Sequence, residues 1–182
     1  MYKSIFPEGI VYASDISPNT LHNVAIPTSR CFPVPPDVFI ALDAEKTPFK
    51  DRTLDAVFAQ SMIHHLPNPA RMFDEVQRIL KPGGCFVAID AAIPRLFRPV
   101  FGGIAQEWEE KWGIQEDLIP YPRWVQLLEC SKLPPSSLRI YTNPRYQSRY
   151  LFKVMGQVVH RIPESMAKRF FPVGVMIVYE KD

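Results

Sequence analysis

Two acidic residues stand where parallel α/β sheets bind their ligands. Asp15 follows the short apolar run Ile10–Ser14, and Asp43 follows a second such run, Val38–Leu42. If both runs are strands of an open sheet, their acids lie at its carboxyl edge, where Asp15 is well placed to accept hydrogen bonds from both hydroxyl groups of a ribose. The alternative for Asp15 is a cap on a helix that starts at Pro18, and the alternative for Asp43 is an ordinary turn.

The tandem histidines His64 and His65 suggest a metal site or acid–base chemistry. Adjacent side chains point apart, and no Cys, Asp or Glu at ligand spacing joins them, so no metal site is expected. A general base needs a substrate proton within hydrogen-bond reach, which a sequence does not define. The sequence therefore assigns no catalytic residue.

The clearest structural signals surround these histidines. Leu54–Ala59 has the length and apolar character of a buried strand, Asn68 and Pro69 are typical of a helix start, and Pro82–Gly84 ends the helix. The apolar residues of this helix fall on one face: Met72, Phe73, Val76, Ile79 and Leu80. A second apolar run, Cys85–Ile89, follows. The pattern predicts a βαβ unit with parallel strands and a right-handed crossover.

This stretch resembles the second half of class I S-adenosylmethionine-dependent methyltransferases, in particular the type-11 methyltransferase domain. The family has a strand of the form FDAV, then HL, a turn, a helix and R-x-L-K-P-G-G. The counterparts here are Leu54–Val57, His65-Leu66, Asn68-Pro69 and Arg78–Gly84. The resemblance implies one α/β domain over residues 1–182, with a Rossmann-like sheet that is mostly parallel and has an antiparallel C-terminal strand.

The same resemblance implies S-adenosylmethionine as cofactor and methyl transfer to a small-molecule acceptor. The implied cofactor-binding residues are Asp15, Ile16, Asp43, Ala44, Gln60, Ser61 and His65. Asp15 would hold the ribose, and Asp43 with Ala44 would contact the adenine amino group. The backbone at Gln60 and Ser61 would lie beside the cofactor. The chain's main work would be to hold donor and acceptor at reacting distance.

One family element has no counterpart in this sequence. A strand and a glycine-rich E/D-x-G-x-G turn should precede the Asp15 strand, but only nine residues precede Ile10. In the family's strand order, 3-2-1-4-5-7-6, that strand is central. We therefore expect an N-terminally truncated sheet; the alternatives are direct pairing of the Ile10 and Leu54 strands, or a strand from a partner.

The missing turn motivates a second function, a non-catalytic methyltransferase-like remnant or partner subunit with weak or no cofactor binding. A third, a nicotinamide-dependent oxidoreductase, would also hold a ribose with an acid such as Asp15. The HL…LKPGG pattern argues against it.

The remaining segments are less informative. By the resemblance, residues 92–136 cover the acceptor site, and their aromatic side chains either line it or pack on the sheet: Trp108, Trp112, Tyr121 and Trp124. Strands are predicted at 138–142 and 173–180. Between them, residues 143–172 read as a basic helical insertion, either packed on the core or in peripheral contact with anionic lipid or an acidic substrate.

The composition limits the classes of protein to which this chain can belong. The chain has 182 residues, 47% hydrophobic, and a net charge of +2, which by itself does not indicate nucleic acid. No apolar run reaches the roughly 20 residues of a membrane-spanning helix, and no signal peptide is visible. Its three cysteines lack metal spacing and indicate reduced thiols in a cytoplasmic protein. The acceptor and the oligomeric state are not defined by the sequence.

Overall fold

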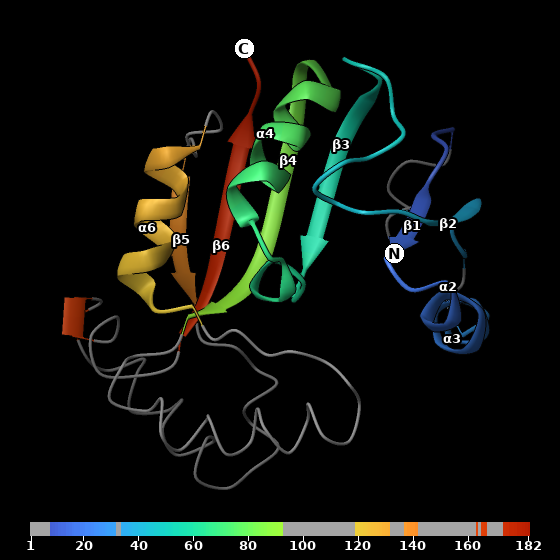
Figure 1. The fold of residues 1–182 in the computed structure, drawn as a ribbon, viewed down its shortest axis with the longest axis horizontal. Helices are drawn as coiled ribbons and strands as arrows, with labels where there is room; N and C mark the ends of the chain where they lie inside the picture. Colours follow the sequence, from blue (N-terminus) through green and yellow to red (C-terminus); the bar gives the residue numbers. More distant parts are fainter. Residues whose placement is uncertain are drawn as a thin grey trace, which may run out of the picture. The chain divides into compact units, whose positions relative to one another are not determined.

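The computed structural model describes residues 8–31, 34–92, 119–131, 137–141, 163, 165–166 and 173–182. The chain divides into two compact units, Met1–Phe49 and Lys50–Asp182, and each is described by itself. Figure 1 shows the strands of the described residues in two sheets, one in each unit: β1-β2 and β3-β4-β6-β5.

The first unit contains two parallel strands with a helical segment between them in sequence. β1 (Tyr12–Asp15) pairs with β2 (Val38–Ala41), and the Leu42 N–H donates to the Asp15 carbonyl at 3.0 Å, just beyond the ladder. The helical segment after β1 consists of α2 (Pro18–Thr20), a π-helical stretch and α3 (Ile26–Ser29). Both predicted strands are confirmed, and their parallel pairing brings their carboxyl ends to one edge of the sheet.

The second unit contains the predicted βαβ unit. β3 (Leu54–Gln60) and β4 (Leu80–Ala92) pair in parallel, with α4 (Pro69–Ile79) between them in sequence. β6 (Val173–Glu180) lies antiparallel to β4, and β5 (Ser137–Tyr141) lies antiparallel to β6. The parallel pair and the antiparallel C-terminal strand confirm the predicted fold class. Since the ladders of β1 run to β2 and those of β3 run to β4, the direct pairing of β1 with β3 is not observed in the described residues.

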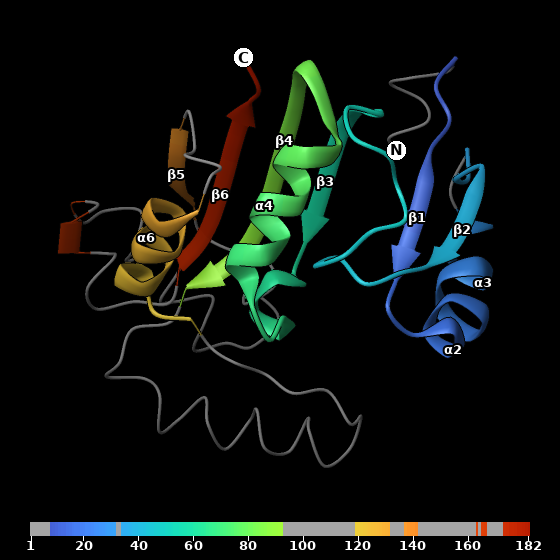
Figure 2. The same cartoon turned by 45° about the horizontal axis from the view of Figure 1, so that its top comes forward.

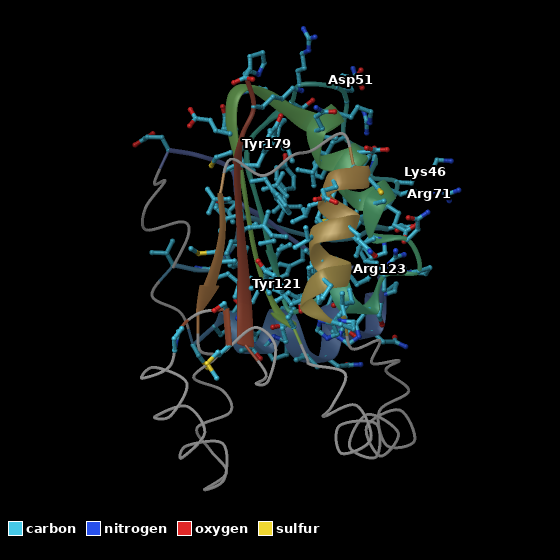
Figure 3. The ribbon with its side chains drawn as sticks, turned by 90° about the vertical axis from the view of Figure 1, so that its left-hand side faces the viewer. Lys46, Asp51, Arg71, Tyr121, Arg123 and Tyr179 are labelled. Atoms are coloured by element: carbon cyan, nitrogen blue, oxygen red, sulfur yellow. The ribbon has the colours of Figure 1, made fainter. Side chains whose placement is uncertain are left out.

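Two helices cover one face of the four-stranded sheet. α4 and α6 (Tyr121–Cys130) lie side by side in front of it in Figure 2 and on the same side of it in Figure 3. The buried face of α4 consists of Met72, Phe73, Val76 and Ile79, as the spacing predicts. The ring centroids of Phe73 and Phe86 of β4 lie 6.2 Å apart in an edge-on arrangement, which favours aromatic packing. This layer is the core of the unit.

The end of α4 differs from the prediction. The helix ends at Ile79, and Leu80 is already extended, with ψ 139°, as the first residue of β4. Residues 81–84 lie opposite Asp55 alone, because the register shifts between Leu54 and Ala56. Lys81-Pro82-Gly83-Gly84 is therefore an irregular part of the strand. Proline is tolerated there because bulged residues need not donate to the ladder.

Groups distant in sequence satisfy the last carbonyls of α4. The Lys181 ammonium donates to the Gln77 and Leu80 carbonyls at 2.5 and 2.8 Å. Backbone N–H groups of Arg52 and Thr53 donate to the carbonyls of residues 78 and 79 at 3.0 and 2.8 Å. A cation at a helix C-terminus also opposes the negative end of the helix dipole. The helix end is thus fixed by segments on both sides of it in the chain.

The two glycines after α4 differ in what they tolerate. A Cβ at Gly84 would lie 2.9 Å from the Lys81 carbonyl oxygen and 3.1 Å from that of Asp55, both rigid backbone atoms. We expect Gly84→Ala to lower the free energy of unfolding by about 2 kcal/mol, as overpacking does. Gly83, with φ +73° and open space around it, should lose about 1 kcal/mol on mutation to Ala because of its left-handed backbone. Denaturant unfolding of both variants measures the difference. A smaller loss of unfolding free energy for Gly84→Ala than for Gly83→Ala would contradict the expected clash of the Cβ with backbone oxygens at Gly84.

Candidate functional site

Asp15 lies at the carboxyl end of β1 with its two oxygens in different situations. Oδ1 accepts the Ser17 N–H at 2.8 Å. Oδ2 makes no hydrogen bond to any residue within the described ranges. The cap of α2 is Ser17, whose Oγ accepts the Thr20 N–H at 3.2 Å. Asp15 therefore supports the turn into the helix without being its cap, and one carboxylate oxygen is left to accept from a ligand.

Asp43 lies two residues beyond β2 and opens a tight turn. Its Oδ1 accepts the Glu45 N–H at 2.8 Å, and its carbonyl accepts the Lys46 N–H at 3.1 Å. Asp43 is exposed and Ala44 is half-buried. The turn interpretation is thus confirmed for Asp43, and this use of Oδ1 does not exclude a contact of the carboxylate with a ligand.

The parallel pairing of β1 and β2 brings these residues to the same edge of the first unit. Asp15 pairs in register with Ala41, and Asp43 follows two residues later. Ile16, also predicted to contact the cofactor, is 72% exposed at this edge. An exposed isoleucine beside an acid with an available oxygen provides an apolar surface next to an acceptor. This combination suits a nucleoside, which has an apolar base and polar sugar hydroxyls.

The other three predicted residues, Gln60, Ser61 and His65, lie together in the second unit, at the end of β3 and in the turn after it. The Ser61 N–H donates to the Ile89 carbonyl at 2.8 Å and so extends the β3–β4 ladder by one residue. Ser61 has φ 50°, a left-handed backbone that costs a non-glycine residue of the order of 1 kcal/mol. The chain then forms a short 3-10 turn, Ile63–His65. The turn redirects the backbone at the carboxyl end of β3.

The rings of His64 and His65 lie against each other, contrary to the expectation that adjacent side chains point apart. Their centroids lie 3.9 Å apart with planes tilted by 47°, and both side chains are half-buried. His64, which had no assigned role, also binds Asp90 at the end of β4, with Nδ1 and Oδ1 2.5 Å apart. The pairing could not be recognised from sequence, because 26 residues separate the partners. The only available signal was an acid at the end of an apolar strand.

The aromatic residues expected near the acceptor divide into three groups. Trp124 is fully buried, and its indole N–H donates to the Ala91 carbonyl at 3.1 Å, so it packs α6 on the sheet. Tyr121 is half-buried at the first position of α6. Trp108 and Trp112 lie outside the described residues, as does most of the basic segment 143–172.

A cluster of three charged side chains, Asp51, Glu75 and Arg78, lies away from the carboxyl end of β3. Arg78 donates to Glu75 and to Asp51 across 2.6–2.8 Å, and these hydrogen bonds, with that to Glu75 the larger cause, raise the pKa of Arg78 above its ordinary value. Figure 3 shows Asp51 near one end of the sheet and Tyr121 toward the other, where α6 begins. The cluster ties α4 to the loop before β3 and is not part of the candidate site.

In the described part of the chain, no group of three or more His, Cys, Asp or Glu side chains is arranged to hold a metal ion. None of the helices in those residues has the length and apolar character needed to cross a membrane.

The chain is similar to known methyltransferases. Residues 2–88 match the sequence model of a family described as "Methyltransferase domain". Cycloartenol-C-24-methyltransferase 1 of Oryza sativa subsp. japonica is 39% identical over 61 residues, 34% of this chain and 18% of that protein. Demethylmenaquinone methyltransferase of Geobacillus stearothermophilus is 28% identical over 153 residues, 70% of this chain and 60% of that protein. The chain thus covers less than two thirds of either relative.

A solved structure with the same fold covers the whole chain. Geranyl diphosphate C-methyltransferase of Streptomyces coelicolor A3(2), solved with Mg²⁺, geranyl diphosphate and S-adenosyl-L-homocysteine, superposes with a TM-score of 0.68 at 15% identity. The match covers 100% of this chain and 66% of that one.

The fold is therefore that of the class I methyltransferases. Residues 2–88 match the sequence model of the methyltransferase domain family, in agreement with the resemblance seen in the motif from Leu54 to Gly84.

Proposed function

We propose that this protein transfers the methyl group of S-adenosylmethionine to a small-molecule acceptor. The observation that carries the proposal is the position of Asp15 within the segment that matches the family. Its carboxylate stands at the carboxyl end of β1, with Oδ2 making no hydrogen bond within the described ranges. An acid in this position of an open α/β sheet is suited to a ribose.

The residues present fit the nucleoside part of the cofactor. Asp15 holds the ribose through its available oxygen, and the turn at Asp43 and Ala44 receives the adenine amino group. The exposed Ile16 side chain contributes apolar contact area. For Gln60, Ser61 and His65, which belong to the second unit, the proposed contact with the rest of the cofactor rests on the family resemblance alone.

Catalysis on this proposal is chiefly positioning. The sulfonium methyl of the cofactor, when bound, supplies the transferred group. The protein's contribution is to orient donor and acceptor and to exclude water, which can account for a large share of the rate enhancement. No residue is assigned here as a general base. The names of the relatives support a small organic acceptor, because they refer to cycloartenol, demethylmenaquinone and geranyl diphosphate.

Calorimetric titration with S-adenosylmethionine and S-adenosylhomocysteine tests the proposal on the 182-residue chain. Saturable heat with both ligands is expected. Asp55→Asn is the matched control: this acid is 84% exposed at the start of β3, pairs with Lys81, and should bind cofactor like the wild type. A chain with a folded circular dichroism spectrum that gives no heat at millimolar cofactor would instead support the alternative function, a non-catalytic methyltransferase-like remnant or partner subunit.

We further propose a cytoplasmic location. The support is that Cys31, Cys85 and Cys130 are all free and exposed, as expected in a compartment that keeps thiols reduced. Thiol labelling in intact cells and in fractions checks this: oxidised cysteines in a secreted fraction would contradict it.

A further inference from the structure

A buried carboxylate in the second unit is not accounted for by the proposed function. Asp90, near the end of β4, is only 2% exposed. Burying a carboxylate is costly unless hydrogen bonds replace its water. Among the described polar side chains, only those of Ser29 and Asp90 belong to buried residues, and Ser29 lies in the other unit. The position of Asp90 therefore needs an explanation.

The partners of Asp90 come from the turn after β3 and from its own strand. Oδ2 accepts the Ile63 N–H at 2.9 Å and, more weakly, the His64 N–H at 3.4 Å. Oδ1 accepts the Ala91 N–H at 2.7 Å and lies 2.5 Å from Nδ1 of the His64 ring. The carboxylate thus ties two backbone groups and one side chain of the turn to the end of β4.

The arrangement fixes which ring nitrogen of His64 carries a proton. Both oxygens of Asp90 already accept backbone N–H groups, so the carboxylate acts as acceptor and Nδ1–H as donor. A histidine held in this way by a carboxylate has a defined tautomer and ring orientation. The His64 side chain is 11% exposed, and its ring stacks on that of His65. Because the two rings are in contact, fixing the orientation of the His64 ring also restricts the His65 ring.

The turn held by Asp90 is the one proposed above to contact the cofactor. Ser61, with its left-handed backbone, and Gln60 immediately precede Ile63–His65, and the Ser61 N–H is bound to Ile89, the residue before Asp90. A strained backbone persists only where its surroundings hold it in place. The hydrogen bonds to Asp90 hold this turn from the side of β4.

We propose that Asp90 and His64 form a positioning pair: their hydrogen bond sets the conformation of the turn from Gln60 to His65 and, through it, the affinity for S-adenosylmethionine. This rests on the proposed function, since it assumes that the turn borders the cofactor. Neither residue touches the reacting atoms in this role. The essential feature is the donated Nδ1–H, and the basicity of the ring plays no part.

Two substitutions at His64 separate hydrogen bonding from other roles of the ring. The side-chain amide nitrogen of asparagine occupies nearly the position of Nδ1 and donates a hydrogen bond, whereas alanine donates none. We expect His64→Ala to weaken S-adenosylhomocysteine binding about tenfold, the loss of one hydrogen bond to a charged group, and His64→Asn to restore it to within about threefold of the wild type. Asp55→Asn, away from the turn, should bind like the wild type.

The readouts are calorimetric affinity, denaturant unfolding and long-range proton–nitrogen NMR of the histidine rings. In the wild type, the NMR spectrum should show His64 protonated at Nδ1. Equal affinity of folded His64→Ala and wild type would overturn the proposal, as would His64→Asn binding as weakly as His64→Ala. Loss of unfolding free energy in His64→Ala with unchanged affinity would likewise reduce the pair to a purely structural role.

These outcomes are distinct from failure of the proposed function. If the wild type itself binds no cofactor, the function fails. If the wild type binds and the His64 variants bind equally well, only the positioning pair fails. Asp90→Asn is not used as the main test, because an amide in place of the carboxylate leaves at least one backbone N–H facing an NH₂ group and so also threatens the fold.

Discussion

Asp15→Asn is expected to weaken binding of S-adenosylhomocysteine by about ten- to a hundredfold. The asparagine oxygen can still accept the Ser17 N–H, so the turn into α2 is kept. The other side-chain position then presents an NH₂ group where a carboxylate oxygen faced the ribose. A hydrogen bond to a charged group is worth about 1.5–3 kcal/mol, which corresponds to this range of affinity. Calorimetric titration measures it.

A ligand that lacks the 2′-hydroxyl shows whether the loss arises at the ribose. The 2′-deoxy form of S-adenosylhomocysteine should bind the wild type more weakly than the parent compound and should bind Asp15→Asn with little further loss. Non-additivity of this kind identifies two groups that interact directly. If both proteins lose the same factor on removal of the hydroxyl, Asp15 does not bind the 2′-hydroxyl of the ribose.

The second large effect concerns the core beneath α4. Phe73 is completely buried and packs edge-on against Phe86. We expect Phe73→Ala to lower the free energy of unfolding by about 3–5 kcal/mol, because it removes a large apolar side chain and leaves a cavity that the sheet cannot close. Since a typical domain is stable by only about 5–15 kcal/mol, a large part of the stability would be lost. Guanidinium unfolding followed by tryptophan fluorescence measures the change, with Trp124 reporting from the same layer.

Arg71→Ala is the matched control for this substitution. Arg71 lies on α4 near Phe73 in sequence, but its side chain is exposed and points away from the sheet (Figure 3). Surface substitutions of this kind usually change stability by no more than about 0.5 kcal/mol. A loss at Arg71 as large as the loss at Phe73 would mean that helix propensity, and not core packing, governs the stability of α4.

Local signals were sufficient for most of the fold. Pro69 is typical of the first position of a helix, and the apolar spacing from Met72 to Ile79 is typical of a helix with one buried face. The structure confirms the start of α4 at Pro69 and this buried face. The short apolar runs ending at Asp15 and Asp43 likewise became paired strands. Such features depend on neighbours a few residues apart, which a sequence displays directly.

The misplaced helix end shows where local signals fail. Pro82 suggested a helix that reached Leu80, but the chain becomes extended at Leu80 itself. The carbonyls of that last turn are satisfied by Lys181, which is about a hundred residues away in sequence. The Asp90–His64 pair was missed for the same reason. Contacts over such separations form only once the sheet is assembled, and no local sequence pattern indicates them.

The candidate site was predictable only as separate pieces. Asp15 and Asp43 were placed at one edge by parallel pairing alone, and Gln60 with Ser61 by the end of β3. Asp15 and Asp43 belong to the first unit, whereas Gln60 and Ser61 belong to the second. Only the family resemblance relates all four residues to one cofactor. The structure adds the local conformation and hydrogen bonding of these residues. Ser17 caps the helix, Asp15 retains an available oxygen, and Ser61 has a left-handed backbone.

A crystal structure of the protein with S-adenosylhomocysteine tests the central claim most directly. The account predicts the ribose hydroxyls within hydrogen-bond distance of the Asp15 carboxylate, with the adenine beside Asp43 and Ala44 and the remainder of the ligand against the turn at Gln60 and Ser61. A ligand bound elsewhere, with the Asp15 carboxylate directed only at Ser17, would contradict it.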